Sequence, residues 1–206
     1  MTRLASPRWA LPILLALCLI AALVVWFAPP EKTMGDGIRP VYVHVALIWT
    51  AMLGMLITAL IGVAVVATGR VAWIGWMQTV GWVSFGFFLA SQLASVWAQL
   101  VNWNGIFWDE PRTQITLRVA VIFLVVLIAN HWLPWPRLRG LSVAIPIALM
   151  LAALRFSPLI LHPRDPISVS SSSPIQLTFV VLFGLCLAAA AQIVWLLRRR
   201  PISPMA

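Results

Sequence analysis

The chain has 206 residues, of which 62% are hydrophobic and only 9% are charged. This composition is typical of an integral membrane protein, and no polar run is long enough to build a separate soluble domain. The net charge of +9 would indicate nucleic-acid binding in a soluble protein, but the basic residues stand mostly at the ends of apolar segments, where they act as topology signals. We therefore expect a single membrane domain over residues 1–206 that contacts membrane lipid and no nucleic acid.

Several motifs are missing, and their absence excludes function classes. The two cysteines, Cys18 and Cys186, lie inside apolar runs, and neither CxxC nor CxxCH occurs, which argues against a disulfide carrier or a covalent haem protein. No GxxxxGK[ST] motif is present, so the chain is not expected to bind and hydrolyse ATP or GTP through a P-loop. No acidic residue lies near the middle of an apolar segment, which makes a small-molecule or proton-coupled transporter the weakest alternative.

Six apolar segments are long enough to cross the ~30 Å hydrocarbon core of a membrane as helices. They cover residues 9–29, 41–68, 72–101, 113–133, 141–161 and 175–197. The first segment follows Arg3 and Arg8 in the manner of a signal peptide, but its apolar length exceeds a typical signal core. Pro146 predicts a kink in the fifth segment. The sequence therefore predicts an all-α integral membrane protein with six transmembrane helices.

The charges predict the orientation of these helices. With the N-terminus in the cytoplasm, the inner segments hold basic residues only: Arg3, Arg8, Arg70, Arg137, Arg139 and Arg198 to Arg200. All five acidic residues then lie on the outer side: Glu31, Asp36, Asp109, Glu110 and Asp165. Cytoplasmic loops collect Lys and Arg, so we expect both termini in the cytoplasm and three longer loops on the outer face. Because irregular backbone often carries function, we expect the functional residues in these outer loops.

The most unusual of the three loops is Trp97 to Thr113, WAQLVNWNGIFWDEPRT. It places Trp97, Trp103 and Trp108 beside an acidic pair and an arginine, between two long apolar runs. Tryptophan is favoured at the level of lipid headgroups, so this loop is expected to lie on the membrane face and present a flat aromatic surface. The plain alternative is an aromatic belt that binds no ligand.

Two of the three histidines are expected near the outer surface. His44 lies near the start of the second segment and His162 just past the fifth, whereas His131 lies at the inner end of the fourth. Imidazole at this depth can relay protons, bind a metal ion or ligate haem iron. Zinc or copper would need further nitrogen or sulfur ligands, which the outer face does not supply, whereas a porphyrin brings four nitrogens of its own. Haem is thus the ligand that these residues favour, and a solvated side chain is the alternative for either histidine alone.

Other polar residues have narrower interpretations. The cations that could neutralise haem propionates on the outer side are Arg39, Arg112, Arg155 and Arg164. Arg118 lies one to two turns into the fourth segment, where it is expected to snorkel outward or to pair with Asp109 or Glu110. Gln92 and Gln99 are seven residues apart on the third segment and are expected to share an inward-packed face.

These motifs resemble the tryptophan-rich (WWD) cytochrome c assembly family, in its six-helix, CcmC-type branch. That family carries a W-G-x-W-W-x-W-D loop between its third and fourth helices and a Y-x-H-V-x-x-x-W motif at the start of its second helix. The matching residues here are Tyr42, His44, Val45, Trp49, Trp97, Trp108, Asp109 and, by position, His162. The resemblance covers residues 26–197. Four features depart from the family pattern. NWNGIF replaces W-G-x-W-W-x, and one residue is inserted after Asp109. The paired tryptophans expected before the second histidine are missing, and Pro163 and Arg164 replace the Gln-Gly that usually follows it.

The resemblance implies a haem-handling protein of cytochrome c maturation in the bacterial plasma (inner) membrane. His44 and His162 would be the axial ligands of non-covalently bound haem b. The remaining binding residues implied are Trp97, Trp103, Trp108, Asp109 and Arg112. The protein would perform no bond chemistry, so it would not be an enzyme; it would hold haem for an outer-face haem chaperone, beside ABC-type haem export subunits. The alternative, motivated by the altered tryptophan motif, is a haem-free scaffold subunit of a larger complex that retains the fold.

Overall fold

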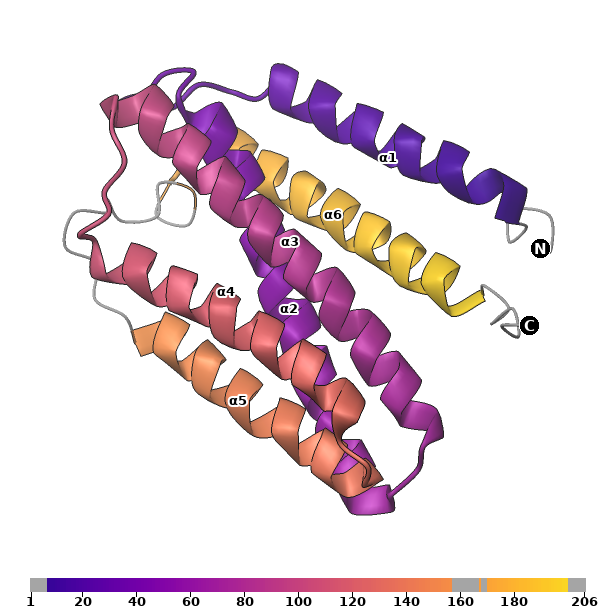
Figure 1. Ribbon diagram of the computed structural model, residues 1–206. Helices are drawn as coiled ribbons and strands as arrows, with labels where there is room; N and C mark the ends of the chain where they lie inside the picture. Colours follow the sequence, from indigo (N-terminus) through magenta and orange to yellow (C-terminus); the bar gives the residue numbers. More distant parts are fainter. Residues whose placement is uncertain (1–6, 157–166, 168–169, 200–206) are drawn as a thin grey trace.

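The computed structural model describes residues 7–156, 167 and 170–199 of the chain (Figure 1). These residues form six α-helices and one short 3-10 helix. Their bounds are α1 Pro7–Trp26, α2 Ile38–Thr68, α3 Ala72–Trp103, α4 Pro111–Ala129, η1 Asn130–Trp132, α5 Pro136–Phe156 and α6 Ser173–Arg199. All six α-helices are long and apolar enough to cross a membrane. The structure thus confirms six helices of membrane-spanning length and hydropathy.

The helix bounds differ from the predicted ones mainly where a charge or a proline stands at the end of an apolar run. α2 begins at Ile38, three residues earlier than expected, so Arg39 lies in its first turn. α4 and α5 begin at Pro111 and Pro136, because proline needs no hydrogen-bond acceptor in the first turn of a helix and its fixed φ suits that position. Pro146 lies inside α5, which continues to Phe156.

The helices α2, α3, α4 and α5 share one apolar core, with α2 at its centre. Met55, Phe88 and Phe123 are fully buried in it. Two close approaches of the helices depend on glycine. A Cβ atom on Gly140 of α5 would lie 2.5 Å from the carbonyl oxygen of Gly62 on α2, and one on Gly54 would lie 2.1 Å from the hydroxyl of Ser84 on α3. Small residues at such crossings let helix backbones pack closely in a membrane, where lipid gives no hydrophobic drive for association.

The helices α1 and α6 form a second layer, which lies beside the four-helix core (Figure 1). α1 packs mainly against α6, and α6 packs against α2 and α3. Near the chain termini, the side-chain amide of Gln192 donates a hydrogen bond to the carbonyl oxygen of Ala10 at 3.4 Å. The first and last helices of the chain are therefore neighbours.

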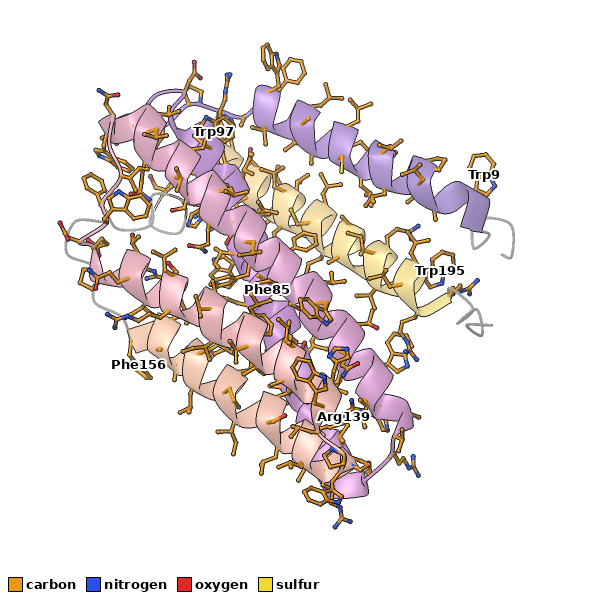
Figure 2. The ribbon with its side chains drawn as sticks, viewed as in Figure 1. Trp9, Phe85, Trp97, Arg139, Phe156 and Trp195 are labelled. Carbon is orange, nitrogen blue, oxygen red and sulfur yellow. The ribbon has the colours of Figure 1, made fainter. Side chains whose placement is uncertain are left out.

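The two ends of the bundle have different connections. One end, the Trp-loop end, holds the connections 27–37 and 104–110; the other, the arginine end, holds 69–71 and 133–135. Figure 2 shows Trp97 near the first and Arg139 near the second.

The arginine end is held by the buried side chain of Asn130. Its Nδ2 donates to the carbonyl oxygen of Arg139 at 2.7 Å and to the hydroxyl of Ser142 at 3.0 Å, and its Oδ1 accepts from Gln78 at 3.0 Å. This one side chain ties α3, η1 and α5 together.

Candidate functional site

His44 lies in the second turn of α2 and is oriented by a contact with α3. Its Nδ1 is 2.9 Å from the backbone carbonyl oxygen of Ser91. A carbonyl oxygen only accepts hydrogen bonds, so Nδ1 carries the proton in this contact. In the neutral ring the lone pair then lies on Nε2, which is the atom that can coordinate a metal. A backbone carbonyl bonded to the second ring nitrogen is the usual way in which a histidine ligand is held in its orientation.

His44 lines a cavity of about 240 Å³ at the Trp-loop end of the core. Ile106 and Trp108 of the connection 104–110 and Arg112 in the first turn of α4 also line it. Leu154, in the last turn of α5, lines the same cavity. The structure therefore brings together three of the predicted site residues, an imidazole, an indole and a guanidinium, although they are up to 68 positions apart in the sequence (44 to 112).

The residues that line the cavity are of the types that bind haem, but the cavity is too small to enclose a haem. An axial ligand, an aromatic wall and a cation for a propionate are the groups that a haem site requires. The cavity of about 240 Å³ is, however, smaller than the roughly 300–1,000 Å³ of most ligand pockets. A haem bound by His44 would therefore extend beyond this cavity, over the surface of the 104–110 connection.

The three tryptophans of the loop are exposed, as predicted, but they do not form one surface. Trp108 lines the His44 cavity, whereas Trp97 lines a cleft beside α1 and α6. Trp103 lies at a polar hollow beside the 30–37 connection, with its ring 5.9 Å from that of Phe107. The expectation that Trp97 and Trp103 join His44 in one site is therefore not met by this arrangement.

Trp97 and Trp103 lie in different surroundings because both belong to α3, which continues to Trp103. The irregular segment is thus 104–110 and not the whole of 97–113. Trp97 and Trp103 stand six residues apart on one helix, and at 3.6 residues per turn this rotates their side chains by roughly 240°. Two indoles with that spacing point to different neighbours.

Gln99 holds the irregular segment against the end of α3. Its side chain is buried, and its Oε1 accepts a hydrogen bond from the backbone N–H of Phe107 at 2.8 Å. Asn104, in the left-handed conformation with φ 51°, ends the helix and turns the chain back. The sequence placed Gln99 correctly on an inward face, but its role as the loop anchor was missed. The signal was a polar side chain inside an apolar helix, which requires a hydrogen-bond partner.

The acidic pair of the loop divides into an exposed and a buried carboxyl. Asp109 is exposed, whereas Glu110 is only 1% exposed and precedes the first turn of α4. A carboxylate at a helix N-terminus is favoured by the helix dipole. Arg112 follows in the first turn of α4 and is half-buried. Arg118 is exposed on α4, and it makes no ion pair with either acid in the part of the chain that the structure describes.

The other predicted residues either lie away from this cavity or belong to the part of the chain that the structure does not describe. His162, Arg164 and Asp165 belong to that undescribed part. Arg39 forms an ion pair with Asp36 beside a different cleft. His131 is exposed at the arginine end, as the sequence predicts, with its Nδ1 3.0 Å from the carbonyl oxygen of Leu127.

The fold defines a multi-pass helical membrane protein. No protein-family model matches the chain, and no curated protein sequence matches it.

Proposed function

We propose that this chain is a haem-handling membrane protein of cytochrome c maturation. It holds non-covalent haem b as cargo at the outer face of a bacterial plasma membrane and passes it to a haem chaperone. The observation that carries the proposal is the placement of His44, which lines a cavity with Trp108 and Arg112 while its Nδ1 is bonded to the carbonyl oxygen of Ser91.

Each of these side chains has a distinct task in the proposal. His44 Nε2 is an axial ligand of the haem iron, because its Nδ1 is engaged with the backbone. Trp108 packs against the porphyrin face, and Arg112 neutralises a propionate. Asp109 is exposed on the same loop, so it is placed to contact the chaperone rather than the propionates, which would repel it.

His162 is the second axial ligand in this proposal. It lies outside the described residues, so its assignment rests on the sequence resemblance. Leu154, in the last turn of α5, lines the His44 cavity. ABC-type haem export subunits complete the set of proposed partners.

The proposal is tested by absorption spectroscopy of the detergent-purified protein, oxidised and then reduced with dithionite. We expect a Soret band with the sharp α and β bands of bis-histidine haem. His44→Ala and His162→Ala should each lose most of the bound haem while circular dichroism shows unchanged helix content. His131→Ala is the matched control, because that histidine lies at the opposite end of the bundle. An unchanged Soret band in both ligand variants would show that the ligand assignment is wrong.

A haem-free scaffold subunit is the second candidate, and two observations favour it. Trp97 and Trp103 lie away from His44, and the His44 cavity has only about 240 Å³. If the purified protein shows no absorption beyond its indoles, even after haem is added back, the scaffold function is the correct one. Genes for an ABC ATPase and a haem chaperone beside this gene would favour haem handling instead.

A further inference from the structure

A second, larger cleft lies between the α1–α6 layer and the helices α2 and α3. It has a volume of about 780 Å³ and almost wholly apolar walls, formed by residues such as Leu14, Val25, Leu47, Phe87 and Leu185. Trp97 lines it, whereas His44, Trp108 and Arg112 do not. The proposed function therefore leaves most of this cleft without a role.

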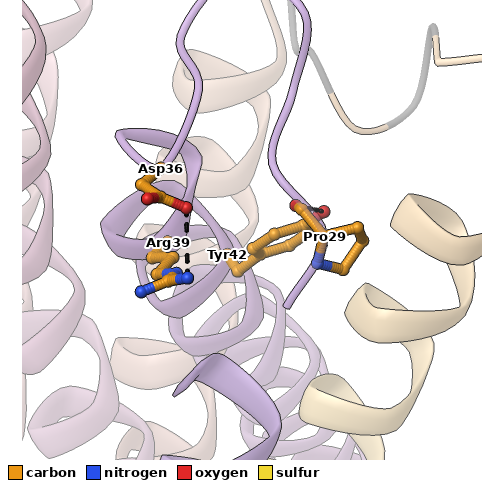
Figure 3. A network of polar contacts seen from close by, with 4 residues as sticks. All are labelled: Pro29, Asp36, Arg39 and Tyr42. Carbon is orange, nitrogen blue, oxygen red and sulfur yellow. Dashed lines mark hydrogen bonds and ion pairs between the residues drawn. The ribbon is translucent and has the colours of Figure 1, made fainter. Parts of the chain in front are cut away.

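The mouth of the cleft carries an ion pair. Arg39 Nη2 lies 3.1 Å from Asp36 Oδ1 (Figure 3), and the guanidinium carbon of Arg39 lies 6.0 Å from the ring centre of Trp26. The hydroxyl of Tyr42 donates to the carbonyl oxygen of Pro29 at 3.4 Å and so holds the 27–37 connection beside this pair. The mouth thus combines one positive group, one negative group and an indole of the kind found at lipid headgroup level.

Arg39 has an unmet hydrogen-bonding requirement. Its Nε is buried and has no hydrogen-bond partner among the described residues, although Nη2 is engaged by Asp36. The Nε itself is covered, but the side chain of Arg39 is 32% exposed, so the Nη atoms of the guanidinium can donate hydrogen bonds to an incoming oxygen acceptor. Phosphate oxygens match a guanidinium in both charge and geometry.

The length of the cleft matches one leaflet of a membrane. Its lining runs from Leu14 to Trp26 along α1, which is about 18 Å at 1.5 Å per residue. Along α3 it runs from Phe87 to Val101, which is about 21 Å by the same measure. Half of the ~30 Å hydrocarbon core is about 15 Å, so the cleft extends from headgroup level to just past the middle of the bilayer.

The walls of the cleft are apolar along its whole length. Lipid acyl chains are slender apolar ligands of this length, and in a bilayer they surround the protein.

We propose that this cleft binds a phospholipid with a phosphatidylethanolamine headgroup. Its acyl chains lie along the apolar walls, its phosphate accepts hydrogen bonds from Arg39, and its ammonium group donates to Asp36. The headgroup carries one negative and one positive charge, which complement the Arg39–Asp36 pair. An anionic headgroup would bring an additional negative charge close to Asp36, and a choline headgroup has no N–H to donate. This inference does not rest on haem binding.

The test is native mass spectrometry of the full chain in mild detergent, after delipidation. The probes are phosphatidylethanolamine, phosphatidylcholine and phosphatidylglycerol with identical acyl chains. We expect phosphatidylethanolamine to bind several-fold more tightly than the other two. A folded protein that binds no phospholipid, that binds all three equally or that prefers phosphatidylglycerol would overturn the proposal.

Two pairs of variants locate the site. Ala189→Phe fills the cleft and should abolish the preferred binding, whereas Ala188→Phe, on an exposed face of α6 outside the cleft, should leave it unchanged. Arg39→Gln should weaken binding several-fold, and the exposed Arg118→Gln should not. Asp36→Asn should remove the preference for phosphatidylethanolamine over phosphatidylglycerol. If Ala189→Phe and Arg39→Gln both bind the lipid as the unaltered chain does, the cleft is not the site.

Discussion

Glu31 organises the short turn that leads from α1 to α2. Its Oε2 accepts a hydrogen bond from the side-chain hydroxyl of Thr33, and it also accepts from the backbone N–H groups of Thr33 at 2.7 Å and Met34 at 3.0 Å. These donors favour the ionised carboxyl, so they hold the pKa of Glu31 below its ordinary value of 4.5. The hydroxyl of Thr33 is the largest cause of this lowered pKa.

A pKa that is lower in the folded state fixes the sign of the pH dependence. The stability that Glu31 contributes is present above the ordinary pKa of 4.5 and is lost as the pH falls through the lowered value. We expect the amides of Thr33 and Met34 to lose hydrogen-exchange protection over that acidic range. In Thr33→Val the Glu31 pKa should rise toward 4.5, which a carbon NMR titration of the carboxyl would measure. An unchanged titration in Thr33→Val would contradict this account.

Asn130 is the polar side chain on which the arginine end depends most. Asn130→Leu would remove the hydrogen bonds of the Asn130 side chain to the side chains of Gln78 and Ser142 and to the carbonyl oxygen of Arg139. We expect a loss of about 1–3 kcal/mol in the free energy of unfolding, measured by titration with a denaturing detergent. Ser142→Ala removes one of these contacts and should cost less. Equal stability of Asn130→Leu and the unaltered chain would show that the network is dispensable.

At the scale of elements, the hydrogen bond from Phe107 N–H to Gln99 decides how the 104–110 connection sits on α3. Gln99→Met keeps a similar volume but removes the acceptor oxygen. We expect faster hydrogen exchange across residues 104–110 in this variant, measured by mass spectrometry. Gln99→Glu retains an acceptor and serves as the control. If exchange in Gln99→Met matches the unaltered chain, the connection is held by other contacts.

The crossing of α2 and α5 depends on the absence of a side chain at Gly140. A Cβ there would meet the carbonyl oxygen of Gly62 at 2.5 Å, so Gly140→Ala should force the helices apart at a cost of about 1–3 kcal/mol. Gly184 on α6 is the matched control, because no atom lies within 4 Å of a Cβ added to it. Gly184→Ala should be neutral or stabilising by up to about 1 kcal/mol, since alanine is the better helix former. The same effect of both changes on thermal unfolding would refute the close crossing.

At the scale of the whole molecule, the distribution of arginines predicts which end faces the cytoplasm. A chain with Cys18 and Cys186 replaced by alanine allows single cysteines to be placed at either end. We expect Thr33→Cys, at the Trp-loop end, to react with a membrane-impermeant maleimide in intact cells. Pro134→Cys, at the arginine end, should react only after the membrane is permeabilised. The reverse pattern would invert the orientation and would place the His44 cavity on the cytoplasmic side.

The sequence predicted the number of helices because length and hydropathy alone determine whether a segment can cross a membrane. It also placed His44 and Arg112 at the same end of the bundle. It did not predict that Trp97 lines the cleft beside α1 and α6 while Trp108 lines the His44 cavity. That distinction depends on where α3 ends and on which helices are its neighbours, and neither is encoded in local composition. The cleft beside α1 arises from packing between helices far apart in sequence, so no single segment indicates it.

The pairing of the first and last helices has a consequence for the timing of assembly. Ala10 and Gln192, which are joined by a hydrogen bond, are 182 residues apart. At the usual synthesis rate of about 5–20 residues per second, the ribosome needs roughly 10–40 s to travel between them. During that interval α1 stands in the bilayer without the helix against which it mainly packs. Its segment from Trp9 to Trp26 contains no charged residue, so lipid can solvate this segment until α6 has been synthesised. Of the six described helices, α1 is made first and is therefore among the last to be packed, and a chain that stops before α6 leaves it without its main partner.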